Sequence, residues 1–278
     1  MKPTLFMCRP DHFGIEYEIN PWMSVSRQAD KRLARSQWET LHEFLSVEMD
    51  ADVRLIEPVR GLPDMVFTAN AGIARNKKFI VSNFRNDERS GERTHYEAWF
   101  KERGYAIHAL PPDHYFEGEG DVLFASDADA YAGYFIRSDV YSHARVATLL
   151  NAHVVSLQLV DPRFYHLDTC FCPLNSESVV YYPEAFDSYA REVIQANFSD
   201  RIEVTTEEAQ QFVCNALVIG DHYIQPRGGA KTLKPALETR GYHVHEFDMS
   251  EFMKAGGATK CLVLKLVKTK GRIPEYKE

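Results

Sequence analysis

Hydrophobic residues follow a helix-then-strand order that repeats five times along the chain. Apolar side chains at helical spacing predict helices over residues 26–46, 91–103, 138–151, 184–198 and 229–240. Short apolar runs after them predict strands over residues 53–56, 105–110, 153–160, 201–205 and 242–248. These strands start about 52, 48, 48 and 41 residues apart. Such a repeat favours a closed array over two domains, although α/β crossovers at similar spacing also build open doubly wound sheets.

A second apolar segment follows each of these strands after a loop, and we expect it to be a strand too. These segments carry the unusual polar residues, at positions 67–70, 117–123, 166–168, 213–216 and 256–264. Because they recur at equivalent points of each unit, an arrangement of the units around an axis would bring the polar groups together there.

The segment at residues 164–171 illustrates the pattern. It places His166 and Asp168 two residues apart in a β-type run, so both side chains are expected on the same side. Burying a polar pair in an otherwise largely apolar strand is costly unless something requires it. The alternative is a hydrogen-bonded core histidine beside a surface aspartate.

The composition of the 278-residue chain narrows the function classes. The length suffices for two average domains or for one large α/β domain. A net charge of −8 without a basic stripe argues against nucleic-acid binding and suits a cationic substrate. The N-terminus lacks the apolar length of a signal peptide, and no 18-residue apolar run predicts a membrane span.

The cysteines indicate the redox environment. Five cysteines scattered along the chain do not form a disulfide framework, so we expect reduced thiols and a cytoplasmic protein.

Cysteine and histidine supply the strongest candidate chemistry. Cys261 follows a Gly-Gly turn that leaves room for close approach of a ligand, although a small core cysteine is the plainer interpretation. His166 lies 95 residues earlier, and a Cys/His nucleophile pair typically meets only in the folded chain. Arg89 and Arg137 offer two guanidinium groups for a substrate carboxylate, or are ordinary surface residues.

A metal site is the weaker alternative. His166, Cys170 and Cys172 lie close together in the sequence, but structural zinc sites usually pair their ligands in CxxC-type knuckles, and no second pair exists. We therefore predict neither a metal nor another cofactor.

Three motifs together resemble those of one superfamily. The segments FEGEGD at residues 116–121, HLDT at 166–169 and GGATKC at 256–261 are similar, in order, to motifs of the guanidine-modifying enzymes. That superfamily contains the amidinotransferases, arginine deiminases and dimethylargininases. The resemblance covers nearly the whole chain. It implies one catalytic domain over residues 1–278, folded as an α/β propeller of five ββαβ units (a pentein), which agrees with the five units counted above.

The resemblance also implies covalent catalysis at a guanidinium carbon. Cys261 would attack the carbon, and His166 would protonate the leaving amine and then deprotonate water. Asp168 and Glu117 would hydrogen-bond the guanidinium nitrogens. Arg137 and Arg89 resemble residues that bind the amino acid's carboxylate.

Two departures from the superfamily pattern refine the interpretation. The acidic motif has an extra residue, so Glu119 competes with Glu117 as the catalytic acid, and Phe116 before it favours Glu117. Deiminases carry an aspartate where this chain has Asn70, and Asn70 together with Asn20 upstream resembles the arginine dihydrolases. An amide can donate a hydrogen bond to a neutral ureido oxygen, which an ionised aspartate cannot.

The resemblance therefore implies a hydrolase that converts arginine to ornithine, ammonia and carbon dioxide. The alternatives are a dimethylargininase, an arginine deiminase that stops at citrulline, an amidinotransferase, and a non-enzymatic binding module of the same fold. We expect a small guanidino compound as the partner, with no nucleic acid and no membrane. The sequence also allows a homo-oligomer.

Overall fold

The structure is a computed structural model that describes residues 2–229 and 231–269. Within these ranges the strands are β1 (Thr4–Cys8), β2 (Asp52–Ile56), β3 (Gly72–Arg75), β4 (Lys78–Val81), β5 (Ala106–His108), β6 (Val122–Phe124), β7 (Asp129–Tyr134), β8 (His153–Gln158), β9 (Phe171–Pro173), β10 (Ser178–Tyr181), β11 (Asp200–Glu203), β12 (Leu217–Ile219), β13 (His222–Pro226), β14 (His243–Phe247) and β15 (Leu264–Val267). The α-helices are α1 (Lys31–Glu43), α2 (Asp87–Ser90), α3 (Glu92–Glu102), α4 (Val140–Leu150), α5 (Ser188–Asn197), α6 (Thr206–Gln210), α7 (Leu233–Thr239) and α8 (Ser250–Met253).

One pairing pattern recurs in the sheets. An inner strand pairs antiparallel with a middle strand, and the middle strand pairs parallel with an outer strand: β6–β7–β8, β9–β10–β11, β12–β13–β14 and β3–β4–β5. The parallel pair needs a crossover, and a helix supplies it each time, for example α4 between β7 and β8. The predicted helix-then-strand repeat is therefore the crossover and the outer strand of each unit.

The last strand completes the first unit. β1 pairs parallel with β2 and antiparallel with β15, with Leu5 opposite Lys265. β15 also pairs parallel with β3, which joins two units into one sheet in the order β2-β1-β15-β3-β4-β5. The two ends of the described chain thus lie side by side.

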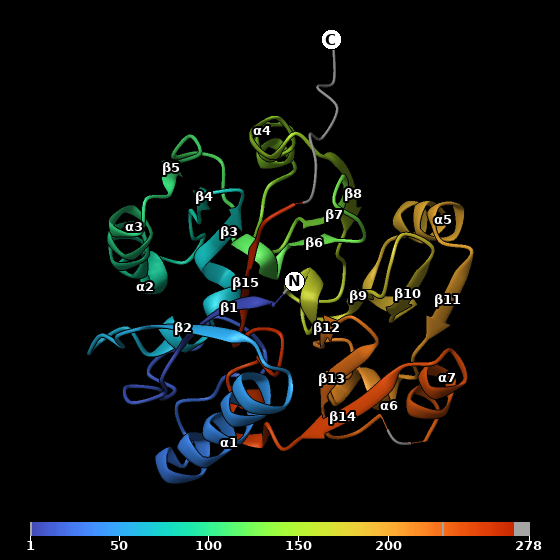
Figure 1. The fold of residues 1–278 in the computed structure, drawn as a ribbon, viewed down its shortest axis with the longest axis horizontal. Coiled ribbons are helices and arrows are strands. Elements are labelled where there is room, and N and C mark those ends of the chain that lie inside the picture. The colour runs from blue at the N-terminus through green and yellow to red at the C-terminus, as the bar shows by residue number, and fades with distance from the viewer. Residues whose placement is uncertain (1, 230, 270–278) are drawn as a thin grey trace.

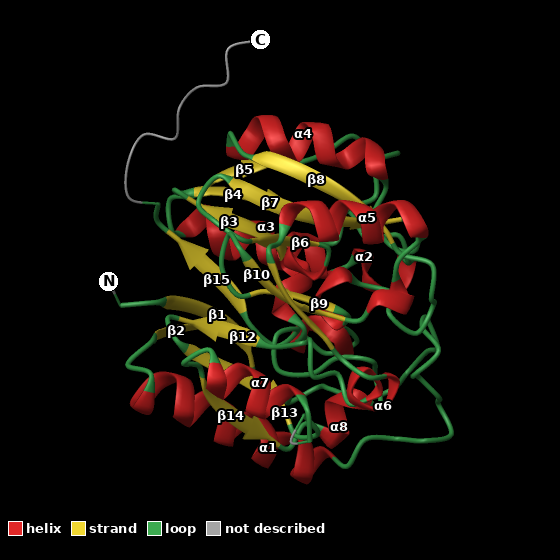
Figure 2. Ribbon diagram, turned by 90° about the vertical axis from the view of Figure 1, so that its right-hand side faces the viewer, coloured by secondary structure: helices red, strands yellow, loops and turns green. Residues whose placement is uncertain are grey.

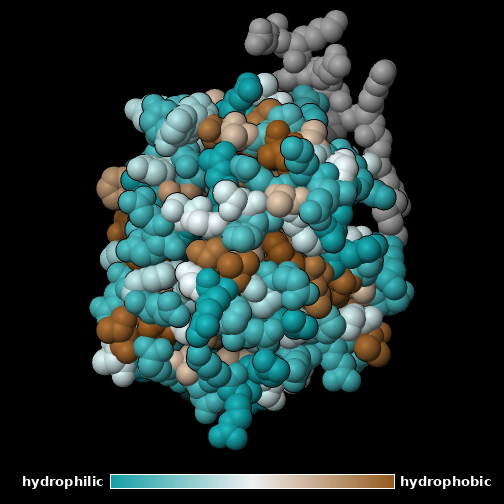
Figure 3. Space-filling view, turned by 90° about the vertical axis from the view of Figure 1, so that its left-hand side faces the viewer, coloured by the Kyte–Doolittle hydropathy of each residue, from teal (hydrophilic) through white to brown (hydrophobic). Residues whose placement is uncertain are grey.

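The helices lie on the outside of the molecule. In Figure 1, α1, α3, α4, α5 and α7 lie around the periphery, with β1, β6, β9 and β12 nearer the middle. Viewed from the side in Figure 2, α4 and α5 flank β8, which both helices contact. The face shown in Figure 3 is mainly hydrophilic, with separate hydrophobic areas. The inner strands are therefore shielded from solvent by the crossovers.

The predicted helices and their outer strands are confirmed, most of them with shorter bounds. α1 begins at Lys31 because Asp30 accepts hydrogen bonds from the backbone N–H groups of Arg32 (2.9 Å) and Leu33 (3.1 Å). The predicted start of the fourth helix at residue 184 is wrong. Asp187 caps α5 by accepting from Ala190 N at 2.7 Å, and a 3-10 turn precedes it.

The polar segments at residues 67–70 and 166–168 are turns, so their prediction as strands is wrong. Thr68–Ala71, Gly118–Gly120 and Leu167–Thr169 form 3-10 turns that lead into β3, β6 and β9. The segments at 213–216 and 256–261 are also turns, before β12 and near β15. These turns come just before the short inner strands, and the polar groups gather in them.

Candidate functional site

The predicted catalytic side chains lie buried in these turns. Asn70, Glu117, His166, Asp168 and Cys261 come from four separate segments of the chain, and each is at most 2% exposed. Buried polar groups need partners or a function. The contacts described next show which of them the fold brings together.

The thiol of Cys261 contacts a carboxylate. Its Sγ lies 3.3 Å from Asp168 Oδ2. Burial raises the pKa of the Cys261 thiol well above its usual value, and the negative charge of Asp168 raises it further. Without a cation beside it, Cys261 is therefore protonated at neutral pH.

The carboxyl group of Asp168 has a raised pKa and an unpaired oxygen. Burial raises its pKa to about 7, although the nearby Lys260 ammonium acts in the opposite direction. Its Oδ1 has no hydrogen-bond partner among the described residues. A buried carboxylate with a free oxygen is suited to accept hydrogen bonds from a cationic ligand.

Asn215 fixes the turn that carries Cys261, and it is not among the site residues predicted from the sequence. Its Oδ1 accepts hydrogen bonds from the backbone N–H groups of Ala258 (3.2 Å), Lys260 (3.0 Å) and Cys261 (3.2 Å). Its Nδ2 donates to Cys261 Sγ at 3.1 Å and to the carbonyl of Asp168 at 3.0 Å. One buried amide thus positions the thiol and gives it a hydrogen-bond donor.

His166 and Glu117 form a buried pair between two of the turns. His166 Nε2 lies 2.7 Å from Glu117 Oε2, and Arg137 Nη1 donates to the same oxygen at 3.1 Å. Burial alone would raise the pKa of Glu117, but Arg137 and His166 outweigh it and hold the pKa well below its usual range. The ionised Glu117 therefore accepts a hydrogen bond from His166 Nε2, and His166 Nδ1, which has no partner among the described residues, is left for a ligand.

Both oxygens of Glu117 are engaged by protein groups. Its Oε1 accepts a hydrogen bond from the backbone N–H of Arg85 at 3.1 Å. The predicted contact of Glu117 with guanidinium nitrogens thus remains a prediction, whereas its contacts with His166 and Arg137 are observed. Arg137 also donates to the carbonyl of Ile19 at 2.8 Å and lies over the ring of Tyr165. Arg137 is therefore held beside the candidate site.

Asn70 connects the site to a buried arginine. Its Oδ1 accepts from Arg89 Nη1 at 2.8 Å, and its Nδ2 has no partner in the described part of the chain. Arg89 is 3% exposed, binds both oxygens of Glu92 at 2.8 and 2.9 Å, and donates to the carbonyl of Asp64. Arg89 thus lies behind Asn70, and orienting the amide is the role that these contacts give it.

Gly120 packs closely against two site residues. A Cβ atom added at Gly120 would lie 2.3 Å from Asn70 Nδ2 and 3.3 Å from His166 Nδ1. The two unpartnered nitrogens therefore both lie next to Gly120. Gly120, the second glycine of the FEGEGD motif, is required by this close approach.

The Gly-Gly turn before Cys261 is filled by side chains. A Cβ at Gly256 (φ 85°) would lie 2.8 Å from the Tyr165 hydroxyl and 2.9 Å from Asn20 Oδ1, and one at Gly257 would lie 2.5 Å from the Phe67 ring. The expectation that the glycines leave space for a ligand is therefore wrong, because protein atoms occupy it. Asn20 donates to the carbonyl of Ala255 at 3.1 Å, so it supports this turn.

Glu119 has different partners. Its Oε2 accepts from Lys260 Nζ at 3.0 Å and from the backbone N–H of Lys265 at 3.3 Å. Glu117, in contrast, pairs directly with the imidazole of His166. Of the two candidate acids, Glu117 is the one placed for acid–base chemistry.

The described residues, 2–229 and 231–269, contain no group of three His, Cys, Asp or Glu side chains that could hold a metal ion. Within the same ranges, no helix is long and apolar enough to cross a membrane.

Comparisons with known proteins place the chain in the superfamily predicted from its motifs. The profile of a family described as N,N dimethylarginine dimethylhydrolase, eukaryotic, matches residues 9–268. The chain belongs to this family of guanidine-modifying enzymes, and the resemblance inferred from the sequence is confirmed.

Two known proteins are similar to this chain over most of its length. It is 43% identical over 267 residues to the bifunctional arginine dihydrolase/ornithine cyclodeaminase ArgZ of Synechocystis sp., a match that covers 94% of this chain and 37% of ArgZ. It is 40% identical over 260 residues to the N(G),N(G)-dimethylarginine dimethylaminohydrolase of Mycobacterium tuberculosis, covering 94% of this chain and 84% of that protein. The chain thus spans little more than a third of the bifunctional relative.

Solved structures share the fold. The N-terminal domain of cyanobacterial ArgZ, with a cysteine replaced by serine and bound to substrate, matches with a TM-score of 0.91 and 42% identity over 96% of this chain and 99% of that one. The molecule is therefore an α/β protein of the same fold as that domain.

Proposed function

We propose that this chain is an arginine dihydrolase, which converts arginine and two waters to ornithine, two ammonia molecules and carbon dioxide. The observation that carries the proposal is the buried contact between the Cys261 thiol and Asp168, with the His166–Glu117 pair in the neighbouring turn. The relatives support it, because ArgZ is named for arginine dihydrolase activity and its N-terminal domain has been solved covalently bound to a reaction intermediate.

In the first half of the reaction, the guanidinium of arginine lies beside Cys261 and donates to the free Oδ1 of Asp168. Its positive charge offsets the burial and the carboxylate that keep the thiol protonated. When substrate is bound, the thiol therefore gives its proton to the imidazole of His166 and becomes a thiolate. The Asn215 amide N–H stabilises that thiolate. Sγ then attacks the guanidinium carbon, a C–N bond breaks, and ammonia leaves.

His166 carries the protons. With Nε2 bonded to the ionised Glu117, its Nδ1 is the nitrogen that exchanges a proton with the substrate. The imidazolium protonates the departing amino group, which leaves as ammonia, and the neutral ring then removes a proton from the water that hydrolyses the thiol adduct. This step yields citrulline and regenerates Cys261.

Asn70 makes the second hydrolysis accessible. Its Nδ2 can donate to the ureido oxygen of citrulline while Arg89 holds Oδ1. Citrulline is thereby retained, Cys261 attacks the ureido carbon, and a second ammonia leaves. Hydrolysis of this adduct gives a carbamate, which decomposes to ornithine and carbon dioxide.

The remaining predicted substrate contacts are parts of the same proposal. Arg137 binds the substrate carboxylate at the edge of the site, since it is fixed beside Glu117 with its guanidinium over Tyr165. Arg89 acts through Asn70, and Asn20 acts by holding the turn before Cys261. A small guanidino amino acid is the partner that these groups suit.

The fold proposal is a single catalytic domain over residues 1–278, built as a five-bladed α/β propeller. The recurring antiparallel-then-parallel pairing supports it, and so does the pairing of β15 with the first unit. The five cysteines are all free and buried, which supports a reducing, cytoplasmic setting.

Products made from arginine test the activity. The protein would be incubated with arginine labelled with ¹³C in the guanidino carbon, and products would be resolved by mass spectrometry, with Cys261→Ala as the inactive control and Cys8→Ala as a matched buried-cysteine control. Labelled carbon dioxide with ornithine is the expected result. Labelled citrulline as the end product would instead make the protein a deiminase.

A dimethylarginine hydrolase is the second candidate, favoured by the family profile and by the M. tuberculosis relative. The same assay with asymmetric dimethylarginine separates the two. Turnover of dimethylarginine to citrulline and dimethylamine, with arginine left unchanged, would replace the dihydrolase assignment.

A further inference from the structure

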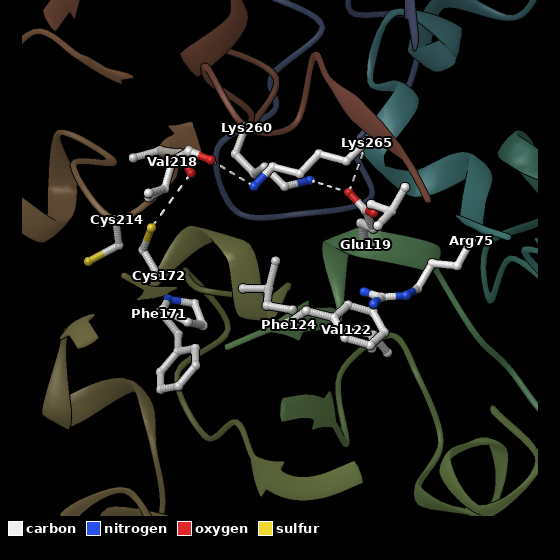
Figure 4. Close-up of a pocket in the computed structure, with 14 residues that line it drawn as sticks. Arg75, Glu119, Val122, Phe124, Phe171, Cys172, Cys214, Val218, Lys260 and Lys265 are labelled. Carbon is white, nitrogen blue, oxygen red and sulfur yellow. Dashed lines mark hydrogen bonds and ion pairs between the residues drawn. The ribbon is translucent and has the colours of Figure 1, made fainter. Parts of the chain in front are cut away.

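A cavity of about 70 Å³ lies next to the segment that carries Cys261, outside the candidate catalytic site. Figure 4 shows Lys260 and Lys265 reaching from this segment towards Glu119 and Val218, with Arg75 against the Phe124 ring. The other walls are mostly apolar side chains of the inner strands β6, β9 and β12 and of the turn before β12. The cavity thus joins four polar side chains to a mostly apolar wall.

Positive charge dominates this lining. Three of its side chains are cationic and Glu119 is the one carboxylate among the lining residues of the described chain. Lys260 Nζ pairs with Glu119 at 3.0 Å and donates to the Val263 carbonyl at 3.1 Å. One carboxylate therefore faces three cations.

The side chains of Arg75 and Lys265 bind groups other than Glu119. Arg75 is 5% exposed and reaches Asp127, an exposed residue outside the cavity, at 3.3 Å. For Lys265 Nζ, the hydrogen-bond acceptor found among the described residues is the carbonyl of Val218 at 2.9 Å. An ammonium group has three donors, so Lys265 has hydrogen-bonding capacity left for a ligand.

Burying excess positive charge is unfavourable unless an anion compensates it. Burial lowers the pKa of the Lys265 ammonium, and the positive charges of Lys260 and Arg75 lower it further, while Glu119 acts in the opposite direction. An anion in the cavity would reverse this cost and satisfy the remaining donors.

We propose that this cavity binds one small inorganic oxyanion of the phosphate class. A guanidinium fork and two ammonium groups suit several oxygens of one anion, and the volume suits a group of about five heavy atoms. The site is separate from the proposed reaction, because within the described chain the side-chain hydrogen bonds of these three cations end on other groups than the catalytic ones.

Inorganic phosphate tests the site directly. Phosphate would be titrated into the whole protein by isothermal calorimetry at pH 7 and constant ionic strength, with sodium chloride as the balancing salt. The expected result is saturable binding of one phosphate, weakened about tenfold or more by Lys265→Met, which removes a charged donor. Lys268→Met, in the segment after β15, is the matched control and leaves the affinity unchanged.

A second variant guards against a folding defect in Lys265→Met. Glu119→Gln removes the competing carboxylate and retains all three cations, so phosphate affinity should increase several-fold. Equal affinity in wild type, Lys265→Met and Glu119→Gln would overturn the proposal, as would the absence of saturable binding to wild type. The phosphate affinities of all variants are measured from binding heats, so the test does not depend on turnover of arginine.

Discussion

At the scale of single residues, Asn215 combines a structural and a chemical task in one amide. Its oxygen accepts hydrogen bonds from three backbone N–H groups of the 258–261 turn, and its nitrogen donates a hydrogen bond to the Cys261 thiol. Substitution by aspartate separates these tasks, because a carboxylate keeps the acceptor and loses the donor. A purely structural role and a role in stabilising the thiolate therefore predict different effects of Asn215→Asp.

We expect Asn215→Asp to slow alkylation of Cys261 by iodoacetamide at pH 8 about 10- to 100-fold, because a hydrogen bond to a charged group contributes about 1.5–3 kcal/mol. Alkylation would be followed by peptide mass spectrometry over a pH series, and the rate should rise at higher pH than in the wild type. Asn215→Ala serves as the comparison that loses both tasks. An alkylation profile of Asn215→Asp that matches wild type would show that the amide only supports the turn.

Asn70 is expected to control how many hydrolyses occur. In Asn70→Asp the site would bind arginine but would hold a neutral ureido group poorly, because the added carboxylate offers no donor and loses its water without compensation. The ratio of citrulline to ornithine should therefore increase about tenfold or more, measured by mass spectrometry of single-turnover products. Asn197→Asp, at an exposed asparagine at the end of α5, is the control. An unchanged ratio would remove Asn70 from the proposal.

The raised pKa of Asp168, about 7, has a consequence for stability. A carboxyl with a folded-state pKa above its unfolded value of about 3.9 contributes stability that is full below pH 4 and is lost as the pH rises through 7. Asp168→Asn removes this dependence. The variant should therefore gain stability relative to wild type as the pH rises from 4 to 7, by about 1.4 kcal/mol for each pH unit in that window.

Urea unfolding at pH 5, 6, 7 and 8 measures this difference. Asp50→Asn changes an exposed carboxylate and should give a curve parallel to that of the wild type. Parallel curves for Asp168→Asn and wild type would mean that Asp168 titrates normally in the folded protein.

The motifs predicted Cys261, His166 and Glu117 as parts of one site, and the structure brings His166 and Glu117 into contact. Asn215 was missed as a site residue because its partner Cys261 lies 46 positions away, and no local pattern encodes such a contact. The one available signal was its place in a polar segment that recurs before an inner strand. Sequence spacing therefore identified the right segment and not the right residue.

At the scale of elements, helices with a long amphipathic pattern were predicted more accurately than short elements. Helices α3 and α4 match their predicted ranges within two residues, because several turns of apolar periodicity define them. The prediction of strands just before β3 and β9 is wrong for a physical reason. A run of four or five residues does not distinguish a strand from a 3-10 turn followed by a short strand, and the difference changes which way His166 and Asp168 point.

The turn between β7 and α4 contains a strained residue. Phe135 has φ of 97° and a side chain that is 66% exposed, so it has little packing to offset a backbone conformation that suits glycine. Phe135→Gly should increase the free energy of unfolding by about 1 kcal/mol. Phe135→Ala, which removes the ring and keeps the Cβ, is the matched control in the same urea unfolding experiment. If both variants shift stability equally, the backbone strain is absent.

At the scale of the whole molecule, the spacing of the helices and outer strands predicted a repeated unit, and the sheets share one pairing pattern. The spacing could not predict how the array ends, because β1 and β15 each have only four or five residues and pair across almost the entire chain. That pairing places the two ends of the described chain together. The position of the last strand thus depends on contacts that have no local sequence pattern.

This pairing predicts that the chain tolerates circular permutation. Residue 269 would be joined to residue 2 by a short Gly/Ser linker, and new termini would be opened between Ser176 and Glu177, in the exposed loop between β9 and β10. Because Leu5 lies opposite Lys265, the linker spans a short gap, and the β1–β15 pairing becomes a hairpin-like connection. The permutant should retain arginine turnover within about threefold and unfold within a few degrees of wild type.

A second permutant makes this experiment decisive. It carries the same linker but opens between Tyr223 and Ile224, which are buried in the middle strand β13, and it should fail to fold because the break interrupts a strand paired on both sides. Circular dichroism and thermal unfolding would compare the two permutants with the wild type. Loss of structure in both would contradict the expectation that β1 and β15 hold the two ends of the described chain within reach of a short linker.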